Sequence, residues 1–573
     1  MEGRTIADGR KQRPLFEKHD TSSPAQSLEG YIASLVIDAM EERDIATIDV
    51  AGAFLKADMP DFVLLRLHGA SLKAILRANK EKYEKFIVIE KGRQVLYVRL
   101  LKAMYGTLKA ALLWYELLSD TLVKEGFTLN PYDPCVANKI VNGKQFTICW
   151  YVDDLKLSHK DPEEVTKMIK LLEKHFGEMN VERGSKHTFL GMNFEIKNKK
   201  VIMKMKDYLT KCIDSFGEVL SSNARTPANP SLMTVNEDAE KLNEEKQALF
   251  HHIVAKLLYI CKRARLDLQV AVGFLCTRVK EPTIQDWQKL KRVLMYIRGT
   301  IDMPRIMSLK DFSTMDIYVD AAHAVHHDMR GQTGGCIQMG TGLIHARSSK
   351  QKLNTKSSTE SEFVGSSDYL PYSLWMLYFF EAQGYSIKRK LFKQDNQSTM
   401  KLLKNGRRLA GKQSRHIETR FFWITDRIKQ NDIEVEYCPT SVMLADFFTK
   451  PLQGSLFRNM RDVSQGLTEY ATLRSLYDKG TPSEEEDREQ IEDSNKTLEK
   501  KNVNENANVL PDNKFVMRRE IDDKKERVGK DENRYKVKLI NIDGNTGNEK
   551  NNDRSKKVRF KSTYADAVRD GFN

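Results

Sequence analysis

The chain has 573 residues, a formal net charge of +14 and seven cysteines. This length accommodates three or four domains, and 40% hydrophobic residues suffice for folded cores. The positive charge favours a polyanionic partner, above all nucleic acid, over the alternative that excess lysine only aids solubility. No two cysteines form a C-x-x-C pair, which argues against a zinc knuckle or a disulfide framework and predicts a reducing compartment. No apolar stretch is long enough to span a bilayer, so no membrane partner is expected.

In chain order the sequence divides into five segments. Residues 1–30 are polar and rich in turn formers, and residues 31–223 alternate apolar periodic stretches with loops. Residues 224–312 begin as a polar connector and continue with helical periodicity. Residues 313–455 change to strands and then alternate helix with strand. Residues 470–573 are charged and poor in core-forming residues, so we expect a largely disordered tail.

Local patterns predict individual elements within these segments. Asp161 is a suitable N-cap and Pro162 a suitable first residue for a helix, which Gly177 would end. The apolar face of this helix consists of Val165, Met168, Ile169, Leu172 and Phe176. Further along, the pattern predicts a strand over Met315–Asp320 and a hairpin over residues 332–348.

Two adjacent aspartates lie between apolar runs in the second segment. Asp153 and Asp154 follow Phe146–Trp150 and precede Leu155–Ser158, which predicts a tight β-hairpin with both carboxylates at its tip. Asp49 occupies a similar apolar setting upstream. Close carboxylates repel one another unless cations neutralise them, and Mg²⁺ prefers carboxylate oxygens together with substrate phosphates. The three aspartates therefore predict a two-metal site for nucleotidyl transfer; the alternative is an ordinary turn with solvated acids.

A second group of acids falls on the strand and helix pattern of residues 313–455. Asp320 ends a predicted strand, and Glu362 lies at the start of an apolar-striped helix. Asp395 follows another strand, and Asp446 lies near the end of the segment. Four acids that converge from such elements can hold two Mg²⁺ ions beside a scissile phosphate. Any one of them alone would more commonly be a solvated residue or a helix cap.

Several motifs resemble those of a known family. The first set is Asp49-Val50-Ala51-Gly52-Ala53-Phe54-Leu55, Leu101-Lys102-Ala103-Met104-Tyr105-Gly106, Trp114-Tyr115, Tyr132-Asp133-Pro134-Cys135, Tyr151-Val152-Asp153-Asp154 and Phe189-Leu190-Gly191. The second set is Lys350-Gln351, Arg415-His416-Ile417, Ala445-Asp446 and Thr449-Lys450. Over roughly residues 4–455 the chain is similar to the reverse transcriptase and ribonuclease H part of copia-type (Pseudoviridae) long-terminal-repeat retrotransposon Pol polyproteins.

The resemblance implies a fold of the α/β and α+β classes. A right-hand polymerase with palm, fingers and thumb would be followed by a ribonuclease H-like α/β domain and the disordered tail. The implied domains are a remnant of the fingers hairpin (1–30), fingers and palm (31–223), thumb or connection helices (224–312) and ribonuclease H (313–455).

The resemblance also assigns roles to residues. Catalytic and metal-binding roles fall on Asp49, Asp153, Asp154, Asp320, Glu362, Asp395 and Asp446, with Glu362 preferred to its neighbour Glu360. Substrate-binding roles fall on Arg4, Phe54, Lys109, Tyr151, Lys412 and Arg415. Arg4 would contact the triphosphate, and the ring of Phe54 would exclude a 2′-hydroxyl. Lys109 stands where the family has glutamine and could contact a triphosphate only as a point charge. Lys412 and Arg415 would face nucleic-acid phosphate.

The sequence departs from the family after Asp320, where Ala-Ala-His replaces the usual Ala-Asp-Trp. His323, His326 and His327 form a local cluster, which we interpret as part of an exposed loop, with a zinc site as the alternative. The lysine-bearing fingers strand of the family is also missing ahead of Arg4.

The family implies two Mg²⁺ ions per active site, with Mn²⁺ as a substitute, and deoxynucleoside triphosphates as substrates. Its partners would be an RNA template, a DNA primer and the RNA–DNA hybrid. Family analogy places the protein in cytoplasmic virus-like particles, with a nuclear stage as the alternative.

Three interpretations follow. The leading one is an RNA-directed DNA polymerase with ribonuclease H activity. The second is an N-terminally truncated, decayed element that binds nucleic acid or retains only the ribonuclease H; the missing fingers strand and Lys109 favour it. The third is a plain nuclease in which the Asp153 hairpin is only structural.

Overall fold

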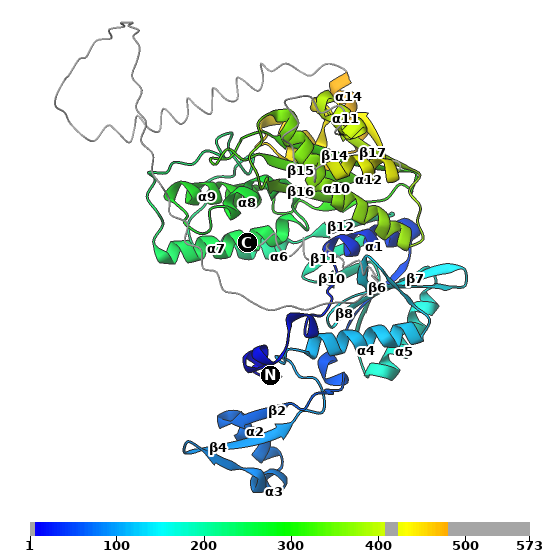
Figure 1. Ribbon diagram of the computed structural model, residues 1–573, viewed down its shortest axis with the longest axis vertical. Coiled ribbons are helices and arrows are strands. Elements are labelled where there is room, and N and C mark those ends of the chain that lie inside the picture. The colour runs from blue at the N-terminus through cyan, green and yellow to red at the C-terminus, as the bar shows by residue number, and fades with distance from the viewer. Residues whose placement is uncertain (1–5, 407–421, 432, 479–573) are drawn as a thin grey trace, which may run out of the picture. The chain divides into compact units, whose positions relative to one another are not determined.

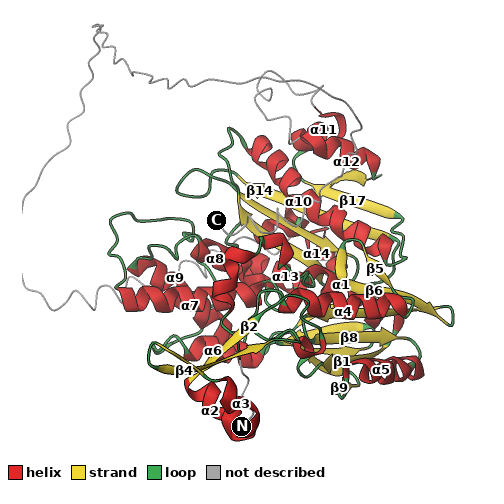
Figure 2. Cartoon of the chain, turned by 60° about the horizontal axis from the view of Figure 1, so that its bottom comes forward, coloured by secondary structure: helices red, strands yellow, loops and turns green. Residues whose placement is uncertain are grey.

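The computed structural model describes residues 6–406, 422–431 and 433–478 (Figures 1 and 2). In this part of the chain the strands form four sheets. No helix among these residues is both long and apolar enough to cross a membrane.

Six antiparallel strands form the first sheet, in the order β5-β6-β7-β8-β1-β9. The strands are β1 Asp44–Asp49, β5 Thr128–Asn130, β6 Asp133–Val141, β7 Lys144–Tyr151, β8 Asp154–His159 and β9 Asn180–Arg183. Helices α4 (Ala110–Lys124) and α5 (Pro162–Phe176) pack on one face, and α1 (Leu28–Glu41) packs on the other. Successive strand residues point to opposite faces. In β7, Ile148 therefore packs in the core under α4 and α5, and Cys149 packs in the core that contains α1.

The helix predicted between Asp161 and Gly177 is confirmed as α5. The Asp161 side chain accepts a hydrogen bond of 2.9 Å from the backbone N–H of Glu163, and the five predicted apolar residues are all buried. Gly177 follows the helix with a φ of 84°, a conformation that favours glycine. Local sequence alone therefore sets the ends of this helix.

Residues 59–101 form a three-stranded module with its own core (Figure 1). Its elements are β2 Leu64–His68, α2 Gly69–Ala78, α3 Lys80–Tyr83, η4 Glu84–Phe86, β3 Val88–Glu90 and β4 Arg93–Arg99, with sheet order β2-β4-β3. Buried Leu67, Leu72 and Leu96 hold it together. The chain enters and leaves the module at adjacent points, because the N–H of Met59 bonds to the carbonyl of Leu101 at 3.0 Å.

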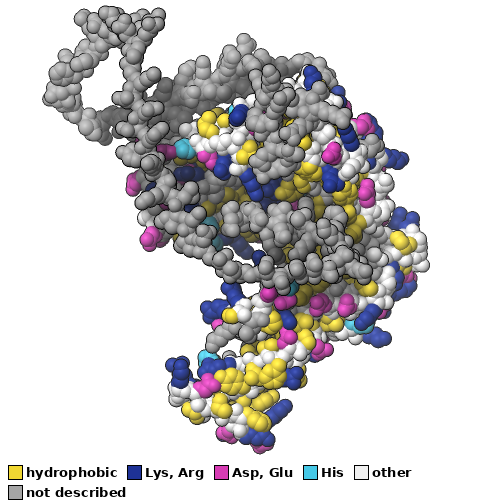
Figure 3. All heavy atoms as spheres, in the orientation of Figure 1, with side chains coloured by type: hydrophobic (Ala, Val, Ile, Leu, Met, Phe, Trp, Pro, Cys, Tyr) yellow, Lys and Arg dark blue, Asp and Glu magenta, His cyan; other side chains and the backbone are white. Residues whose placement is uncertain are grey.

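One face of this module exposes apolar side chains beside arginines. Phe62 is 70% exposed, Leu64 49% and Tyr97 41%, and hydrophobic side chains gather over the module in Figure 3. The Arg99 guanidinium lies 5.2 Å from the centre of the Phe62 ring. Large exposed apolar groups next to cations are typical of an interaction surface.

A small antiparallel sheet and a helical layer follow. The strands, in the order β10-β11-β12-β13, are Lys186–Phe189, Met192–Lys197, Lys200–Lys204 and Arg305–Met307. The helices are α6 Lys206–Asp214, α7 Glu244–Cys261, α8 Gln269–Cys276 and α9 Ile284–Gly299. Gln465 ties a later part of the chain to this layer, because its side chain accepts from Leu266 N–H and donates to the Ala264 carbonyl.

The last sheet has five strands in the order β16-β15-β14-β17-β18. The strands are β14 Thr314–Ala322, β15 Gln332–Gln338, β16 Leu343–Lys350, β17 Arg389–Gln394 and β18 Ile433–Tyr437; β14, β15 and β16 are antiparallel, and β14, β17 and β18 are parallel. The predicted strand over Met315–Asp320 and the predicted hairpin are thus confirmed. Helix α10 (Ser358–Ala382) packs on this sheet, and α11 (Gln397–Asn405) and α12 (Trp423–Gln430) follow. A Cβ at Gly335 would lie 2.3 Å from the Tyr369 ring, so only glycine permits this packing.

The expectation of disorder from residue 470 is wrong for its first nine residues. Tyr470–Asp478 forms helix α14, which follows α13 (Gly454–Ser464). The Tyr470 hydroxyl donates to the Val442 carbonyl at 3.1 Å, and Leu473 is 1% exposed. Tertiary docking therefore orders a helix that its charged sequence surroundings concealed. The rest of the predicted tail lies outside the described residues.

A buried group of charges links α1 to the first sheet. Asp38 of α1 forms ion pairs with Lys156 of β8 and, at 3.5 Å, with Arg43. The side chains of all three are fully buried. Removing one member would leave a charge buried without its partner, which costs far more than an exposed pair contributes.

We therefore expect Asp38→Asn to lower the free energy of unfolding by about 3–5 kcal/mol in urea denaturation. Glu42→Gln is the matched control, because Glu42 pairs with Lys199 on the surface at 3.4 Å. That change should cost less than about 1 kcal/mol. Equal losses in the two variants would contradict the structural role of the buried pair.

Candidate active sites

The first group of carboxylates lies where β1, β7 and β8 meet. Asp49 ends β1 and is paired in register with Asp154, which begins β8. Asp153 lies in the two-residue turn between β7 and β8, and its carbonyl accepts a 3.1 Å hydrogen bond from Val50 N–H. The structure thus brings the three predicted aspartates to one end of the sheet.

The charges of these aspartates act on one another. The pKa of Asp154 is raised to about 6, first by burial and then by the charges of Asp153 and Asp49. One oxygen from each of Asp49, Asp153 and Asp154 cannot be chosen so that all three lie within 4.8 Å of one another. Among the described residues, a second group of acids, described below, does meet this distance. The carboxylates of the first site are also more exposed than those of the second, since Asp49 is exposed whereas Asp320 and Glu362 are buried.

The predicted substrate-binding residues have separate surroundings. Phe54 lies in η3 (Ala53–Lys56) and packs on Tyr105, with ring centres 4.4 Å apart. The Lys109 ammonium pairs with Asp61 at 2.8 Å and lies 4.6 Å from the centre of the Phe16 ring. Tyr151 ends β7 and is 39% exposed. Arg4, Lys412 and Arg415 lie outside the described residues.

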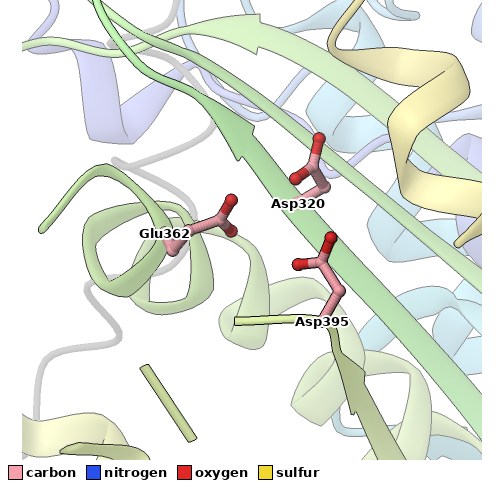
Figure 4. Close-up of side chains that lie close together, drawn as sticks. All are labelled: Asp320, Glu362 and Asp395. Atoms are coloured by element: carbon pink, nitrogen blue, oxygen red, sulfur yellow. The ribbon is translucent and has the colours of Figure 1, made fainter. Parts of the chain in front are cut away.

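A second group of carboxylates lies on the five-stranded sheet. Asp320 of β14, Glu362 of α10 and Asp395, directly after β17, each offer an oxygen within 4.8 Å of the other two. Figure 4 shows the three side chains pointing toward one another from a strand, a helix and a strand end. Asp320 and Glu362 are buried and Asp395 is half-buried. This is the arrangement that the sequence predicted for three of its four acids.

Asp446 is connected to the second site through Lys450. It lies in η10 (Leu444–Phe448), and one of its oxygens accepts from the Lys450 ammonium at 2.9 Å. Lys450 also lies 3.6 Å from Asp320, whose carboxylate accepts a 2.5 Å hydrogen bond from the Thr449 hydroxyl. The other Asp446 oxygen, Oδ1, is buried without a hydrogen-bond partner. Lys450 therefore forms ion pairs with Asp320 and Asp446, two of the acids that the sequence predicted as metal ligands.

Burial and mutual repulsion set the protonation of this site. The pKa of Glu362 is raised well above its usual range, by burial and by the charge of Asp320. The pKa of Asp446 is raised to about 8 for the same two reasons. Burial would also raise the pKa of Asp320, but Lys450 and hydrogen bonds lower it below its usual range. One acid is therefore held ionised while its neighbours are pushed toward the protonated form.

The choice of Glu362 over Glu360 has a structural counterpart. Glu360 accepts a 2.8 Å hydrogen bond from Lys356 N–H at the start of α10, where Ser357 is the N-cap. Its carboxylate thus takes part in helix capping, and Glu362, two residues on, faces Asp320.

The three histidines beside this site have separate partners. His323 bonds to the Thr355 and Ser361 hydroxyls, and His326 bonds to Gln332 at 2.8 Å. His327 pairs with Glu237. The exposed-loop interpretation is wrong for His326, which is 5% exposed. No histidine belongs to a metal-binding group among the described residues, so the zinc alternative gains no support.

Sequence reasoning gave no role to two side chains that complete the second site. Gln394 is fully buried, its amide oxygen accepts from Asp395 N–H at 2.8 Å, and its amide nitrogen lies 3.4 Å from Glu362. Thr440 donates to Asp395 at 2.8 Å. Gln394 directly precedes Asp395 in the sequence, so its role could have been predicted from that position. The contact of Thr440 with Asp395 could not, because it joins distant parts of the chain.

Comparison with known proteins places the first site in a family. Residues 1–230 match the family described as reverse transcriptase (RNA-dependent DNA polymerase), and this range contains Asp49, Asp153 and Asp154. This part of the chain is a reverse transcriptase domain. Over about 80% of its length the chain is also similar to copia-type retrotransposon Pol polyproteins.

Two curated relatives illustrate this relationship. The chain is 25% identical to the retrovirus-related Pol polyprotein from transposon TNT 1-94 of Nicotiana tabacum over 469 residues, 80% of this chain and 34% of that protein. It is 23% identical to the transposon Ty1-BR Gag-Pol polyprotein of Saccharomyces cerevisiae over 475 residues, 79% of this chain and 26% of that protein. The chain thus spans about a third or a quarter of the length of these relatives.

Among solved structures, the chain is similar to a foamy viral protease–reverse transcriptase in complex with double-stranded DNA. The match covers 77% of this chain and 60% of the viral chain. The sequence identity is 12% and the TM-score 0.40.

Both groups of carboxylates fit divalent cations chemically. Hard cations such as Mg²⁺ take oxygen ligands, and each site offers several carboxylates close together. The orphaned Oδ1 of Asp446 is a further oxygen without a partner at the second site. Burial is the main cause of the raised pKa of Asp154 and Glu362, and cations bound there would relieve the part that comes from repulsion between carboxylates.

The raised pKa of Asp154 predicts a pH-dependent stability for the metal-free reverse transcriptase domain. An unfolded aspartate has a pKa of about 3.9, so the folded state binds the proton more tightly. The stabilising contribution of that proton is present below pH 4 and is lost as the pH rises through about 6. Asp154→Asn should therefore gain stability relative to the wild type between pH 4 and pH 7, by on the order of 1 kcal/mol for this half-buried group.

Denaturation in EDTA across this pH range would test the effect. Asp153→Asn should show part of the same gain, since it removes one of the repelling charges. A stability difference between Asp154→Asn and the wild type that does not change with pH would contradict it.

The ion pairs of Lys450 predict an altered response to Mg²⁺. Lys450→Met removes the cation that neutralises Asp320 and Asp446, so in EDTA the melting temperature should fall by a few degrees, on the order of 1 kcal/mol. Added Mg²⁺ should then raise the melting temperature of the variant more than that of the wild type. Lys350→Met is the matched control, because Lys350 pairs with Asp328 at 2.7 Å. An equal Mg²⁺ response in the two variants would rule out competition between Lys450 and the metal.

Proposed function

We propose that the chain is an RNA-directed DNA polymerase joined to a ribonuclease H. The observation that carries the polymerase is the register of β1 and β8, which sets Asp49 beside Asp154 and next to the Asp153 turn within a reverse transcriptase domain. In this proposal residues 31–223 are fingers and palm, residues 224–312 are thumb or connection helices, and residues 313–455 are the ribonuclease H.

In the proposed polymerase, Asp49 and Asp153 hold two Mg²⁺ ions and Asp154 supports the hairpin. Such ions supply a lowered pKa at a primer 3′-hydroxyl and stabilise the charge on the leaving pyrophosphate. The residues of the chain position these groups: the β1–β8 register fixes Asp49 and Asp154, and the turn presents Asp153. Phe54, five residues after Asp49 in the chain, packs on Tyr105, and in this proposal its ring excludes a 2′-hydroxyl from the incoming nucleotide.

The proposed ribonuclease H uses Asp320, Glu362, Asp395 and Asp446. Three antiparallel strands followed by two parallel ones, with acids from β14, α10 and the end of β17, support this assignment. Bound Mg²⁺ would supply an activated water and charge stabilisation at the scissile phosphate. The chain itself holds the acids in place through Gln394, Thr449 and Thr440.

Nucleic acid is the proposed partner. The net charge of +14 supports binding to a phosphate backbone without sequence preference. On the three-stranded module, exposed Tyr97 and Phe62 lie near Arg66 and Arg99, and aromatic rings beside arginines are suited to stacked bases. An RNA template, a DNA primer, their hybrid and deoxynucleoside triphosphates are the ligands of this proposal.

A second candidate is a protein that retains only the ribonuclease H. Two observations favour it. Among the described residues, the acids that come close enough together to share a metal ion are Asp320, Glu362 and Asp395. The pairing of Lys109 with Asp61 also leaves its ammonium less available to a triphosphate.

Separate active sites predict separable activities. Asp153→Asn should abolish primer extension on an RNA template with Mg²⁺ and deoxynucleotides, by at least about a thousandfold, and should leave cleavage of the hybrid intact. Asp395→Asn should have the reverse effect. Both activities can be measured in one reaction with a labelled primer and a labelled template.

The outcomes separate the candidates. Cleavage without extension in the wild type would support the second candidate. Loss of both activities from either single change, in a folded protein, would contradict the two-site proposal.

A further inference from the structure

The turn that carries Asp153 has an unusual backbone. Val152 has a φ of 60°, in the left-handed region. A valine is rarely found there, because its branched Cβ crowds the backbone, and glycine, asparagine or aspartate is the usual residue at such a turn position. The hairpin therefore needs contacts from outside to keep this conformation.

One such contact comes from α4. The indole N–H of Trp114 donates a 2.6 Å hydrogen bond to the Val152 carbonyl. Trp114 is 1% exposed, and the edge of its ring system packs against Phe176 of α5 with centres 5.1 Å apart. Burial and this ring contact fix the position of the donor, so it can hold the Val152 carbonyl in one orientation.

A second contact comes from the residue that follows β1. The N–H of Val50, the residue after Asp49, donates to the Asp153 carbonyl at 3.1 Å. The two peptide carbonyls of the turn are therefore held from two different places, Trp114 of α4 and Val50 directly after β1. Rotation of the turn to a relaxed conformation would break both hydrogen bonds and would turn Asp153 away from Asp49.

We infer that Trp114 is a positioning residue of the polymerase site, which holds Val152 in its left-handed conformation and thereby presents Asp153 beside Asp49. The inference rests on the proposed polymerase function. Trp114 does not touch the reacting groups and acts through the turn. Its indole N–H is the essential feature, in addition to the ring volume that any core residue supplies.

The test combines two substitutions. Trp114→Phe keeps an aromatic ring but removes the N–H, so kcat for primer extension should fall, on the order of tenfold, with a smaller change in the KM for nucleotide. Glycine adopts a positive φ freely, so adding Val152→Gly to Trp114→Phe should restore part of the lost kcat. A residue that only fills the core would not be rescued in this way.

Trp150→Phe is the matched control. Trp150 is buried in the same core, is also 1% exposed, and its indole N–H has no hydrogen-bond partner. The change removes the same atoms from the same core without touching the turn carbonyl. Comparable losses of kcat in Trp114→Phe and Trp150→Phe, each corrected for the folded fraction, would overturn the inference, as would a double variant no faster than Trp114→Phe.

Hydrogen–deuterium exchange gives a readout that does not need catalysis. The Val50 amide is protected by its bond to Asp153, so its exchange should speed up in Trp114→Phe but not in Trp150→Phe. If the wild type extends no primer, the proposed polymerase fails, and the exchange data alone then decide whether Trp114 holds the turn. Unchanged exchange at Val50 in Trp114→Phe would overturn the inference.

Discussion

Repulsion between carboxylates is the constraint on which both sites of this chain depend. Acids that must lie close together raise one another's pKa, and the fold has to hold them there against that repulsion. The first site leaves its acids partly open to water and fixes them through strand register. The second buries its acids and introduces the ammonium of Lys450 among them. The two sites therefore solve the same electrostatic problem with different means.

Strand β8 has two functions in this arrangement. Its first residue, Asp154, belongs to the acidic site, and two residues later Lys156 on the same face of the strand is buried against Asp38 of α1. The ion pair therefore anchors the strand two residues after Asp154. Asp154 is therefore held in place by the strand pairing and by the buried ion pair of Lys156, and not by a loop.

The features that local patterns determine were predictable from the sequence. The caps and apolar stripe of α5, the Asp153 hairpin and the strand before Asp320 each depend on residues within one short segment. The structure also brings Glu362 close to Asp320 and Asp395, and its catalytic role stays a prediction. The contacts of Thr449 and Lys450 with Asp320 were not predictable, because they join residues about 130 positions apart that meet only in the folded sheet.

The errors have the same origin. His326 was expected in an exposed loop, but its bond to Gln332 buries it beside β15. Helix α14 was expected to be disordered because its neighbours along the chain are charged, yet Tyr470 and Leu473 dock on the domain. In both cases tertiary packing outweighs local composition.

The path of the chain around the three-stranded module has an evolutionary consequence. Asp58 and Lys102 are bridged across the point where the chain leaves and returns, so the entire excursion is closed at its base. Its core of Leu67, Leu72 and Leu96 is separate from the core of the larger sheet. A change in the length or sequence of this excursion therefore leaves the connectivity of the sheet that bears the aspartates unchanged, because the two points where the chain leaves and returns lie side by side.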